Sequence, residues 1–243
     1  MDRPFERRTA ARTAVVWDAV RALLGPGEGG AEGQRVLDIG GGTGGLAVRI
    51  AALGHTVTVV DPSPDALAAL ARRADEEGVA DRVTGLQGEL GPDLAPEGSI
   101  DLVLCHGVLG LVEDPAAALA TLGSVLRPGG HLSLLVSQRH AAVLARAMAG
   151  HFTQARALLD GAPTDQRAAE HRFTAEEIGD LLARTGFTTT AVHGIRIFSD
   201  LVPSSLLDLE PGAAAALLDL ERAAAERPEY LTLASQLHVL ASR

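Results

Sequence analysis

The order of apolar and polar runs along the chain predicts strands and helices in alternation. Short apolar runs rich in Val, Ile and Leu predict strands, and longer runs with spaced apolar positions predict helices. We expect strands at residues 35–39, 56–60, 83–87, 100–105, 131–136, 188–192 and 232–241, and helices at 45–53, 64–77, 115–126, 174–185 and 212–226. Strands that alternate with helices form right-handed βαβ units, so the sequence predicts an α/β fold with a parallel sheet covered on both faces.

The length and the breaks in this alternation predict a single domain, residues 1–243, with two additions. A chain of 243 residues that is 47% hydrophobic can form one large core. Residues 1–30 are expected to form an N-terminal helix and a linker, because residues 25–30 are rich in glycine and proline. Residues 138–172 are helical in composition and interrupt the alternation. Ligands bind at the carboxyl edge of such sheets, so this insertion is expected to form the substrate side.

Composition and charge exclude several classes of function. A formal charge of −10 argues against a broad nucleic-acid-binding surface. No apolar run approaches the roughly 18–20 residues that span a bilayer, and no signal peptide is expected, so we expect a cytoplasmic protein with no membrane partner. The single Cys105 excludes an internal disulfide, and its place in an apolar run predicts burial. The eight histidines show no ligand spacing, so no metal is expected.

A glycine cluster follows the first predicted strand and offers a ligand site. The strand contains Asp38, and Gly40, Gly42 and Gly44 let the backbone turn sharply next to the following helix. A ligand can then lie against main-chain N–H groups at the start of that helix. Gly40, Gly42 and Gly45 fit the dinucleotide pattern G-x-G-x-x-G. The pattern D-x-G-x-G-x-G that begins at Asp38 also resembles the first motif of S-adenosylmethionine (SAM) methyltransferases, in which the acid can pair with the cofactor ammonium group.

Two further positions suit an adenosyl ligand. Asp61 ends the second predicted strand, where a carboxylate can accept from both hydroxyls of a ribose. It suits SAM and a dinucleotide equally, and the alternative is a helix cap before residues 62–64. After the third strand, Glu89 can accept from the exocyclic amine of adenine. Leu90 can cover the adenine ring or donate its backbone N–H.

Two segments carry a resemblance that decides between the cofactors. Residues 100–109 and 126–132 resemble the fourth and fifth strands of class I SAM-dependent methyltransferases, including the Arg-Pro-Gly-Gly turn. Ordinary NAD dehydrogenases do not share these segments. The resemblance implies a Rossmann-like fold with a seven-stranded, mostly parallel sheet and an antiparallel last strand. It also implies SAM as cofactor and S-adenosylhomocysteine as product.

The chain from Arg12 to the C-terminus resembles a narrower family, the bacterial tRNA carboxymethoxyuridine methyltransferases. These enzymes methylate the carboxylate of a modified uridine at the wobble position of the anticodon. Beyond the generic fold, the likeness lies in the segments that follow the fifth strand. It is seen in residues 12–17, 106–109, 122–130, 140, 148–152, 194–200, 218–221 and 228–233. This resemblance implies tRNA as the partner.

The resemblance also implies roles for individual residues. Arg12 is expected to bind the SAM carboxylate, Asp61 to hold the ribose, and His106 to flank the methyl donor. An arginine at one end and an acid at the other would fix the orientation of the zwitterionic amino-acid part of SAM. The alternative for His106 is a histidine packed in the core. The complete expected cofactor set is Arg12, Asp38, Gly40, Gly41, Gly42, Asp61, Pro62, Glu89, Leu90 and His106.

The sequence departs from this family at two places. The family has a longer stretch before Arg12 with an aromatic segment, and it has a lysine-rich run where this chain has the neutral-to-acidic residues 159–165. Phosphate groups need cations and splayed bases need stacking partners. Both departures weaken the case for tRNA as the acceptor. The second interpretation is therefore an O-methyltransferase for a small anionic metabolite.

The acceptor chemistry predicts an arginine more than a base. A carboxylate acceptor is already ionised at pH 7, so no general base is required and no catalytic residue is assigned. An arginine could hold the acceptor anion with its forked donors. The candidates are Arg139, Arg172 and Arg196, with His140 beside them; each could instead be a surface or helix-end residue. A phenol acceptor would instead need a base such as His140 or His106.

Overall fold

The computed structural model describes residues 4–24, 33–161, 171–207 and 211–243, and its described side chains begin at residue 14 and exclude Ser204. The chain divides into two compact units. Unit 1 comprises residues 1–18, 135–180 and 191–239, and unit 2 comprises residues 19–134, 181–190 and 240–243. The expected linker at 25–30 and part of the insertion, residues 162–170, lie outside the described residues.

Unit 2 contains part of every strand of a seven-stranded sheet. The strands are β1 (Arg35–Ile39), β2 (Thr56–Asp61), β3 (Val83–Gln87), β4 (Ile100–His106), β5 (Leu126–Ser137), β6 (Thr188–Ile195) and β7 (Gln236–Ser242), in the order β3-β2-β1-β4-β5-β7-β6. β1 pairs in parallel with β2 and β4, and β2 pairs in parallel with β3. The order reverses between β1 and β4, which is where sheets of this kind bind ligands.

The central strands β1 and β4 are largely buried because they carry apolar side chains on both faces. Leu37 of β1 and Leu102, Val103 and Leu104 of β4 are almost completely buried. Near-continuous apolar strands of this kind are typical of parallel sheets covered by helices on both sides. The predicted α/β architecture is therefore confirmed, and the carboxyl ends of β1, β2 and β4 meet at one edge.

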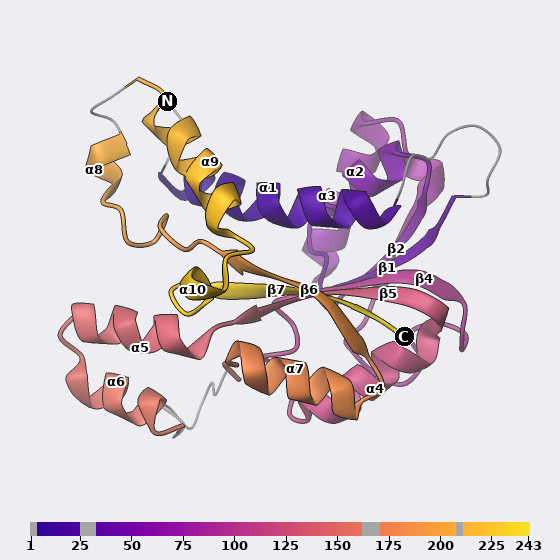
Figure 1. The fold of residues 1–243 in the computed structure, drawn as a ribbon. Helices are drawn as coiled ribbons and strands as arrows, with labels where there is room; N and C mark the ends of the chain where they lie inside the picture. Colours follow the sequence, from indigo (N-terminus) through magenta and orange to yellow (C-terminus); the bar gives the residue numbers. More distant parts are fainter. Residues whose placement is uncertain (1–3, 25–32, 162–170, 208–210) are drawn as a thin grey trace. The chain divides into compact units, whose positions relative to one another are not determined.

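Three helices of unit 2 cover this part of the sheet. Figure 1 shows α2 (Ala47–Ala52) and α3 (Pro64–Glu76) on one side and α4 (Pro115–Val125) on the other. Asp114 caps α4 by accepting from the N–H of Ala116 at 2.9 Å, as its sequence predicts. Ser63 caps α3 by accepting from the N–H of Ala66 at 3.2 Å. A 3₁₀ turn (Ala80–Arg82) leads into β3, and α1 (Pro4–Leu24) and α7 (Ala175–Arg184) belong partly to each unit.

Unit 1 contains the predicted helical insertion. Its described part forms α5 (Arg139–Met148) and α6 (Phe152–Leu159), which pack against each other (Figure 1). Gln138 caps α5 by accepting from the N–H groups of its first turn, and its amide donates to the carbonyl of Leu231 at 2.9 Å. The unit also contains α8 (Ser204–Leu207), α9 (Ala213–Ala224) and α10 (Pro228–Leu231).

Two predicted boundaries are wrong. The Arg-Pro-Gly-Gly segment was expected to form a turn between a helix and a fifth strand that begins at residue 131, but β5 already begins at Leu126. The reason is pairing with the C-terminus, because the N–H of Gly129 donates to the carbonyl of Arg243 at 2.9 Å, and the N–H of Arg243 donates to the carbonyl of Gly130 at 3.1 Å. Two residues of β5 thus oppose one residue of the C-terminus, with Gly129 at φ +74°, which is the pattern of a β-bulge between antiparallel strands. The last strand begins at Gln236 and not at residue 232, since residues 228–231 form α10.

Candidate functional site

The glycine turn after β1 brings the backbone close to its neighbours. Gly40 has φ +68°, and its N–H donates to the carbonyl of Val60 at 2.8 Å. A Cβ atom on Gly40 would lie 2.5 Å from Cγ2 of Val108, and one on Gly41 would overlap the carboxylate of Asp38. These positions therefore require glycine because no side chain fits, and the same lack of a Cβ lets a ligand approach the main chain of the turn closely.

Asp61 connects this turn to the start of α3. The side chain is 8% exposed, its Oδ2 accepts from the N–H of Gly42 at 2.9 Å, and its Oδ1 accepts from the N–H of Ser63 at 2.9 Å. Asp61 thus fixes the turn and the entry to α3, as the helix-cap alternative expects. Each carboxylate oxygen has a second lone pair, so these contacts leave acceptor capacity for the hydroxyls of a sugar.

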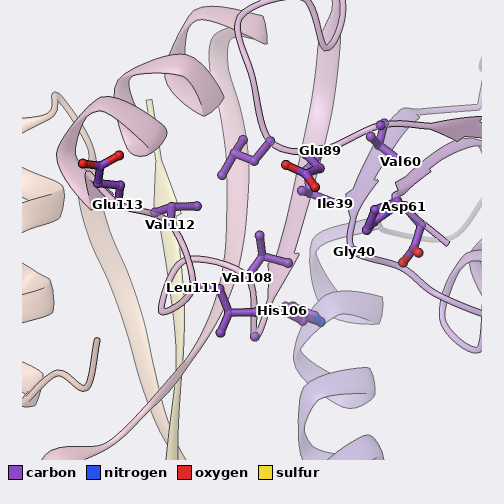
Figure 2. A pocket seen from close by; sticks show the side chains of 14 residues that line it. Ile39, Gly40, Val60, Asp61, Glu89, His106, Val108, Leu111, Val112 and Glu113 are labelled. Carbon is purple, nitrogen blue, oxygen red and sulfur yellow. The ribbon is translucent and has the colours of Figure 1, made fainter. Parts of the chain in front are cut away.

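A cavity of about 640 Å³ opens where β1, β2 and β4 end. All of its lining residues belong to unit 2, and Figure 2 shows Asp61 and His106 from strand ends, with Glu89 and Glu113 from the loops after β3 and β4. The lining residues are Ile39, Gly40, Val60, Asp61, Pro62, Gly88, Glu89, Leu90, His106, Gly107, Val108, Leu111, Val112 and Glu113.

The structure brings six of the ten expected cofactor residues to this cavity. These are Gly40, Asp61, Pro62, Glu89, Leu90 and His106. Asp38, Gly41 and Gly42 belong to the end of β1 and its turn but are not among the lining residues. Arg12 lies in α1, and its side chain is outside the described part of the structure.

Sequence reasoning missed most of the loop after β4. Val108, Leu111, Val112 and Glu113 all line the cavity, and Leu111 is 71% exposed. The resemblance covered residues 106–109 as a segment but gave only His106 a role. The available signal was a leucine between a predicted strand end and a helix cap, because a large apolar side chain on a loop beside a strand end often contacts a ligand.

The environment of Asp38 favours a cation. The side chain is 4% exposed, and burial, together with the nearby negative charge of Asp61, raises the pKa of Asp38 from 3.8 to about 7. A positively charged group placed beside it would stabilise the ionised form and lower that pKa again. The acid side chains, the open glycine turn and the cavity therefore fit an adenosyl ligand with an ammonium group.

His106 lies at the cavity wall with a fixed ring, whereas the neighbouring Cys105 is buried. Nε2 of His106 lies 2.9 Å from Oγ of Ser133, a fully buried side chain of β5, so the imidazole ring is fixed at the cavity wall. The neighbouring Cys105 is buried, and burial raises the pKa of its thiol to about 12, which excludes a thiolate nucleophile at neutral pH. Among the described residues, no group of three or more His, Cys, Asp or Glu side chains could hold a metal ion.

The four acceptor candidates all belong to unit 1. Arg139 pairs with Oε2 of Glu177 at 2.8 Å and donates to the carbonyl of Arg172 at 3.2 Å, so it ties α5 to α7. His140 is exposed in the first turn of α5. Arg196 has φ +57°, and its Nη2 donates to Oδ2 of Asp200 at 2.6 Å. Left-handed backbone at a non-glycine residue is uncommon and is found most often where structure serves function.

None of the described helices combines the length and the apolar character needed to cross a bilayer.

Comparison with known proteins identifies related chains over nearly the whole length. A family described as "Methyltransferase domain" matches residues 7–192. The tRNA 5-carboxymethoxyuridine methyltransferase of Escherichia coli K12 is 31% identical, over 96% of this chain and 88% of its own. A ubiquinone biosynthesis O-methyltransferase of Xanthomonas euvesicatoria is 38% identical, over 53% of this chain and 54% of its own. The crystal structure of an S-adenosylmethionine-dependent methyltransferase from Mesorhizobium loti shares the fold, with a TM-score of 0.62, 24% identity, and coverage of 96% and 100%.

Proposed function

This chain belongs to the family of S-adenosylmethionine-dependent methyltransferases, and we propose that it is a cytoplasmic enzyme that methylates the carboxylate of carboxymethoxyuridine in tRNA. The observation that carries the acceptor is the extent of the likeness to the E. coli enzyme. That likeness covers 96% of the chain, whereas the general methyltransferase match ends at residue 192. It therefore takes in most of residues 193–243, which the generic domain does not explain.

The cofactor site follows from the cavity of unit 2. We assign Asp38 to the ammonium group, because its raised pKa marks a place where a cation is favourable. We assign Asp61 to the ribose hydroxyls and Glu89 with Leu90 to the adenine, since all three line the cavity. Gly40 and Pro62 complete this surface, and we also assign Gly41 and Gly42 of the same turn to the cofactor.

The chain's own residues perform binding and alignment. SAM, when bound, would supply a sulfonium methyl group: an oxygen would attack the methyl carbon in line as its bond to sulfur breaks, and S-adenosylhomocysteine would leave. An ionised carboxylate is itself the nucleophile, so the protein needs no general base. Its contribution is to hold the carboxylate in line and to exclude water. His106, held by Ser133, forms a fixed wall of the cavity beside which we place the methyl donor.

We assign the acceptor carboxylate to Arg196. Arg139 pairs with Glu177 and also donates to the carbonyl of Arg172, so it ties two helices together, and His140 is an exposed residue in the first turn of α5. Arg196 is held by one acid, Asp200, and its side chain is still 31% exposed. A guanidinium carries five N–H donors, so those not used by Asp200 can meet a second carboxylate.

Arg12→Ala is expected to weaken SAM binding without unfolding the protein. Removing a charged hydrogen-bond donor from the cofactor carboxylate should raise the dissociation constant about tenfold. Isothermal titration calorimetry with SAM measures this. Arg21→Ala is the matched control, because Arg21 is an exposed residue in the last turn of the same helix. Equal SAM affinity of Arg12→Ala and Arg21→Ala would contradict the assignment of Arg12.

The acceptor is tested with tRNA from a strain that lacks this gene. We expect the purified enzyme to transfer labelled methyl groups from SAM to this tRNA, and mild alkali to release the label because the product is a methyl ester. tRNA from the parent strain is the control and should accept less label. No incorporation into either tRNA contradicts the proposal.

A second acceptor class has one observation in its favour. The formal charge of −10 and the neutral-to-acidic residues 159–165 do not favour a long polyanion. If tRNA takes no label but a small-molecule extract of the same strain does, the enzyme is an O-methyltransferase for a small anionic metabolite.

A further inference from the structure

A buried carboxylate lies behind the loop that carries Arg196. Glu221 of α9 is 1% exposed, so it cannot itself bind a substrate. Its Oε2 accepts from the N–H of Ile197 at 2.9 Å. Its Oε1 accepts from the N–H groups of Phe198 at 3.0 Å and Ser199 at 2.7 Å, and from the hydroxyl of Ser199. Three consecutive backbone N–H groups and one hydroxyl thus converge on a single side chain.

Removing a carboxylate from water is costly unless its oxygens are hydrogen-bonded. Here the oxygens of Glu221 accept from backbone N–H groups and a hydroxyl, all from residues 197–199. The carboxylate therefore fixes the course of the main chain over these three residues, beginning at the residue next to Arg196.

Both the backbone and the guanidinium of Arg196 are therefore held in place. Its backbone has φ +57°, and the next N–H is bound by Glu221. Its guanidinium donates from Nε at 3.0 Å and from Nη2 at 2.6 Å to Oδ2 of Asp200. The same oxygen of Asp200 accepts from the hydroxyl of Ser235 at 2.6 Å, which attaches this ion pair to the chain just before β7. An arginine arranged in this way loses little freedom when it binds an anion.

We propose that Glu221 is a positioning residue for the methyl acceptor. It holds residues 197–199 in the one conformation that presents the guanidinium of Arg196 to the acceptor carboxylate. Phe198, fixed by the same carboxylate, packs edge-on against Tyr230 at 5.7 Å between ring centroids, so the loop is braced on its other side as well. This inference rests on the proposed function, in which the acceptor bears a carboxylate and Arg196 binds it.

The test is a double-mutant cycle of Glu221→Gln and Arg196→Ala. The amide has the shape of the carboxylate but turns an NH₂ group toward backbone donors, so the loop must shift. Glu221→Gln is expected to raise the KM for the tRNA acceptor about tenfold, with kcat and the SAM dissociation constant changed less than about twofold. If Glu221 acts through Arg196, adding Glu221→Gln to Arg196→Ala causes no further loss of kcat/KM.

Two further variants separate positioning from folding. Ser199→Ala removes only the hydroxyl contact to Glu221 and should raise the acceptor KM about threefold, which keeps the test decisive if Glu221→Gln fails to fold. Asp219→Asn changes an acid on the same helix whose side chain is 78% exposed, and should leave both KM values unchanged. Thermal unfolding confirms that each variant is folded at the assay temperature.

The outcomes distinguish this inference from the function on which it rests. Multiplicative losses in the double mutant, or a loss of SAM affinity as large as that of acceptor affinity, overturn the role of Glu221 while wild-type activity on tRNA upholds the function. Binding of the carboxymethoxyuridine nucleoside, measured by calorimetry, gives a readout that does not depend on turnover. Wild-type protein that neither methylates tRNA nor binds this nucleoside overturns the proposed function and this inference together.

Discussion

Asp38→Asn is expected to make the ligand-free protein more stable and almost to abolish cofactor binding. Burial, and then the charge of Asp61, raise the pKa of Asp38 from 3.8 to about 7, which means that the folded state disfavours the ionised carboxylate. A shift of this size corresponds to at most about 4 kcal/mol of stability that ionisation removes above pH 7. A neutral amide of the same shape avoids this loss.

The raised pKa of Asp38 also determines how its contribution to stability changes with pH. Because the folded-state pKa lies above the unfolded value, the stability that Asp38 contributes is fully present below about pH 4 and is lost as the pH rises through about 7. Asp38→Asn should therefore stabilise by about 1–3 kcal/mol at pH 8 and by less at pH 5. Urea unfolding at both pH values measures the difference.

Asp101→Asn is the contrasting control. Burial tends to raise the pKa of Asp101, but hydrogen bonds from the N–H of Arg35 at 2.7 Å and from Arg127 lower it overall. Its stability contribution is therefore present at neutral pH and is lost on acidification. Asp101→Asn should destabilise at pH 8, the opposite sign to Asp38→Asn. The same sign for both variants would show that burial does not penalise the Asp38 charge.

Cofactor binding should change in the opposite direction to stability. Removing one partner of a desolvated charge pair costs about 3 kcal/mol, so Asp38→Asn should weaken SAM binding by more than a hundredfold. Wild-type affinity should rise as the pH increases through about 7, because Asp38 must be ionised to pair with the ammonium group. Calorimetry at pH 6 and pH 8 measures both effects. Unchanged affinity in Asp38→Asn would mean that another group holds the ammonium.

Gly44→Ala is expected to destabilise the glycine turn by about 3 kcal/mol. Gly44 has φ +75°, and a Cβ atom there would overlap Cδ1 of Leu70, a side chain of α3 that is 1% exposed and cannot move into solvent. The variant therefore meets both backbone strain and overpacking. Urea unfolding measures the loss, and SAM titration should show weaker binding as the turn shifts.

Gly78→Ala separates the two contributions to this loss. Gly78 has φ +69°, close to that of Gly44, but a Cβ atom there would meet nothing within 4 Å. Only the backbone strain remains, so this variant should lose about 1 kcal/mol and keep its affinity for SAM. Equal losses in the two variants would show that contact with Leu70 contributes nothing.

The sequence predicts the glycine turn and the acids at the strand ends of unit 2 because their signals are local. The turn after β1, Asp61 at the end of β2 and Glu89 after β3 each follow from neighbours within a few residues, and a parallel sheet brings the strand ends to one edge. The loop at residues 108–113 was missed because most of its residues are apolar. Their pattern predicts burial as readily as a cavity wall.

The choice among the candidate arginines for the acceptor could not be made from the sequence. The sequence offers Arg139, Arg172 and Arg196 as equal candidates, and only distant contacts distinguish Arg139 from Arg196. Glu177, 38 positions from Arg139, takes that arginine as a structural partner. Glu221, 24 positions from Ile197, fixes the loop of Arg196 from inside.

By itself, the sequence determined the fold class, the glycine turn and the acids at the ends of the strands. These depend on the backbone freedom of glycine, on apolar periodicity and on acids at strand ends, all of which act over a few residues. Only the tertiary structure decided that β5 begins at Leu126 and that Asp38 is buried enough to resist ionisation. The tertiary structure alone also showed which arginine lies next to a loop that a buried carboxylate holds. Desolvation and hydrogen-bond partners depend on residues that are distant along the chain, and no local pattern encodes them.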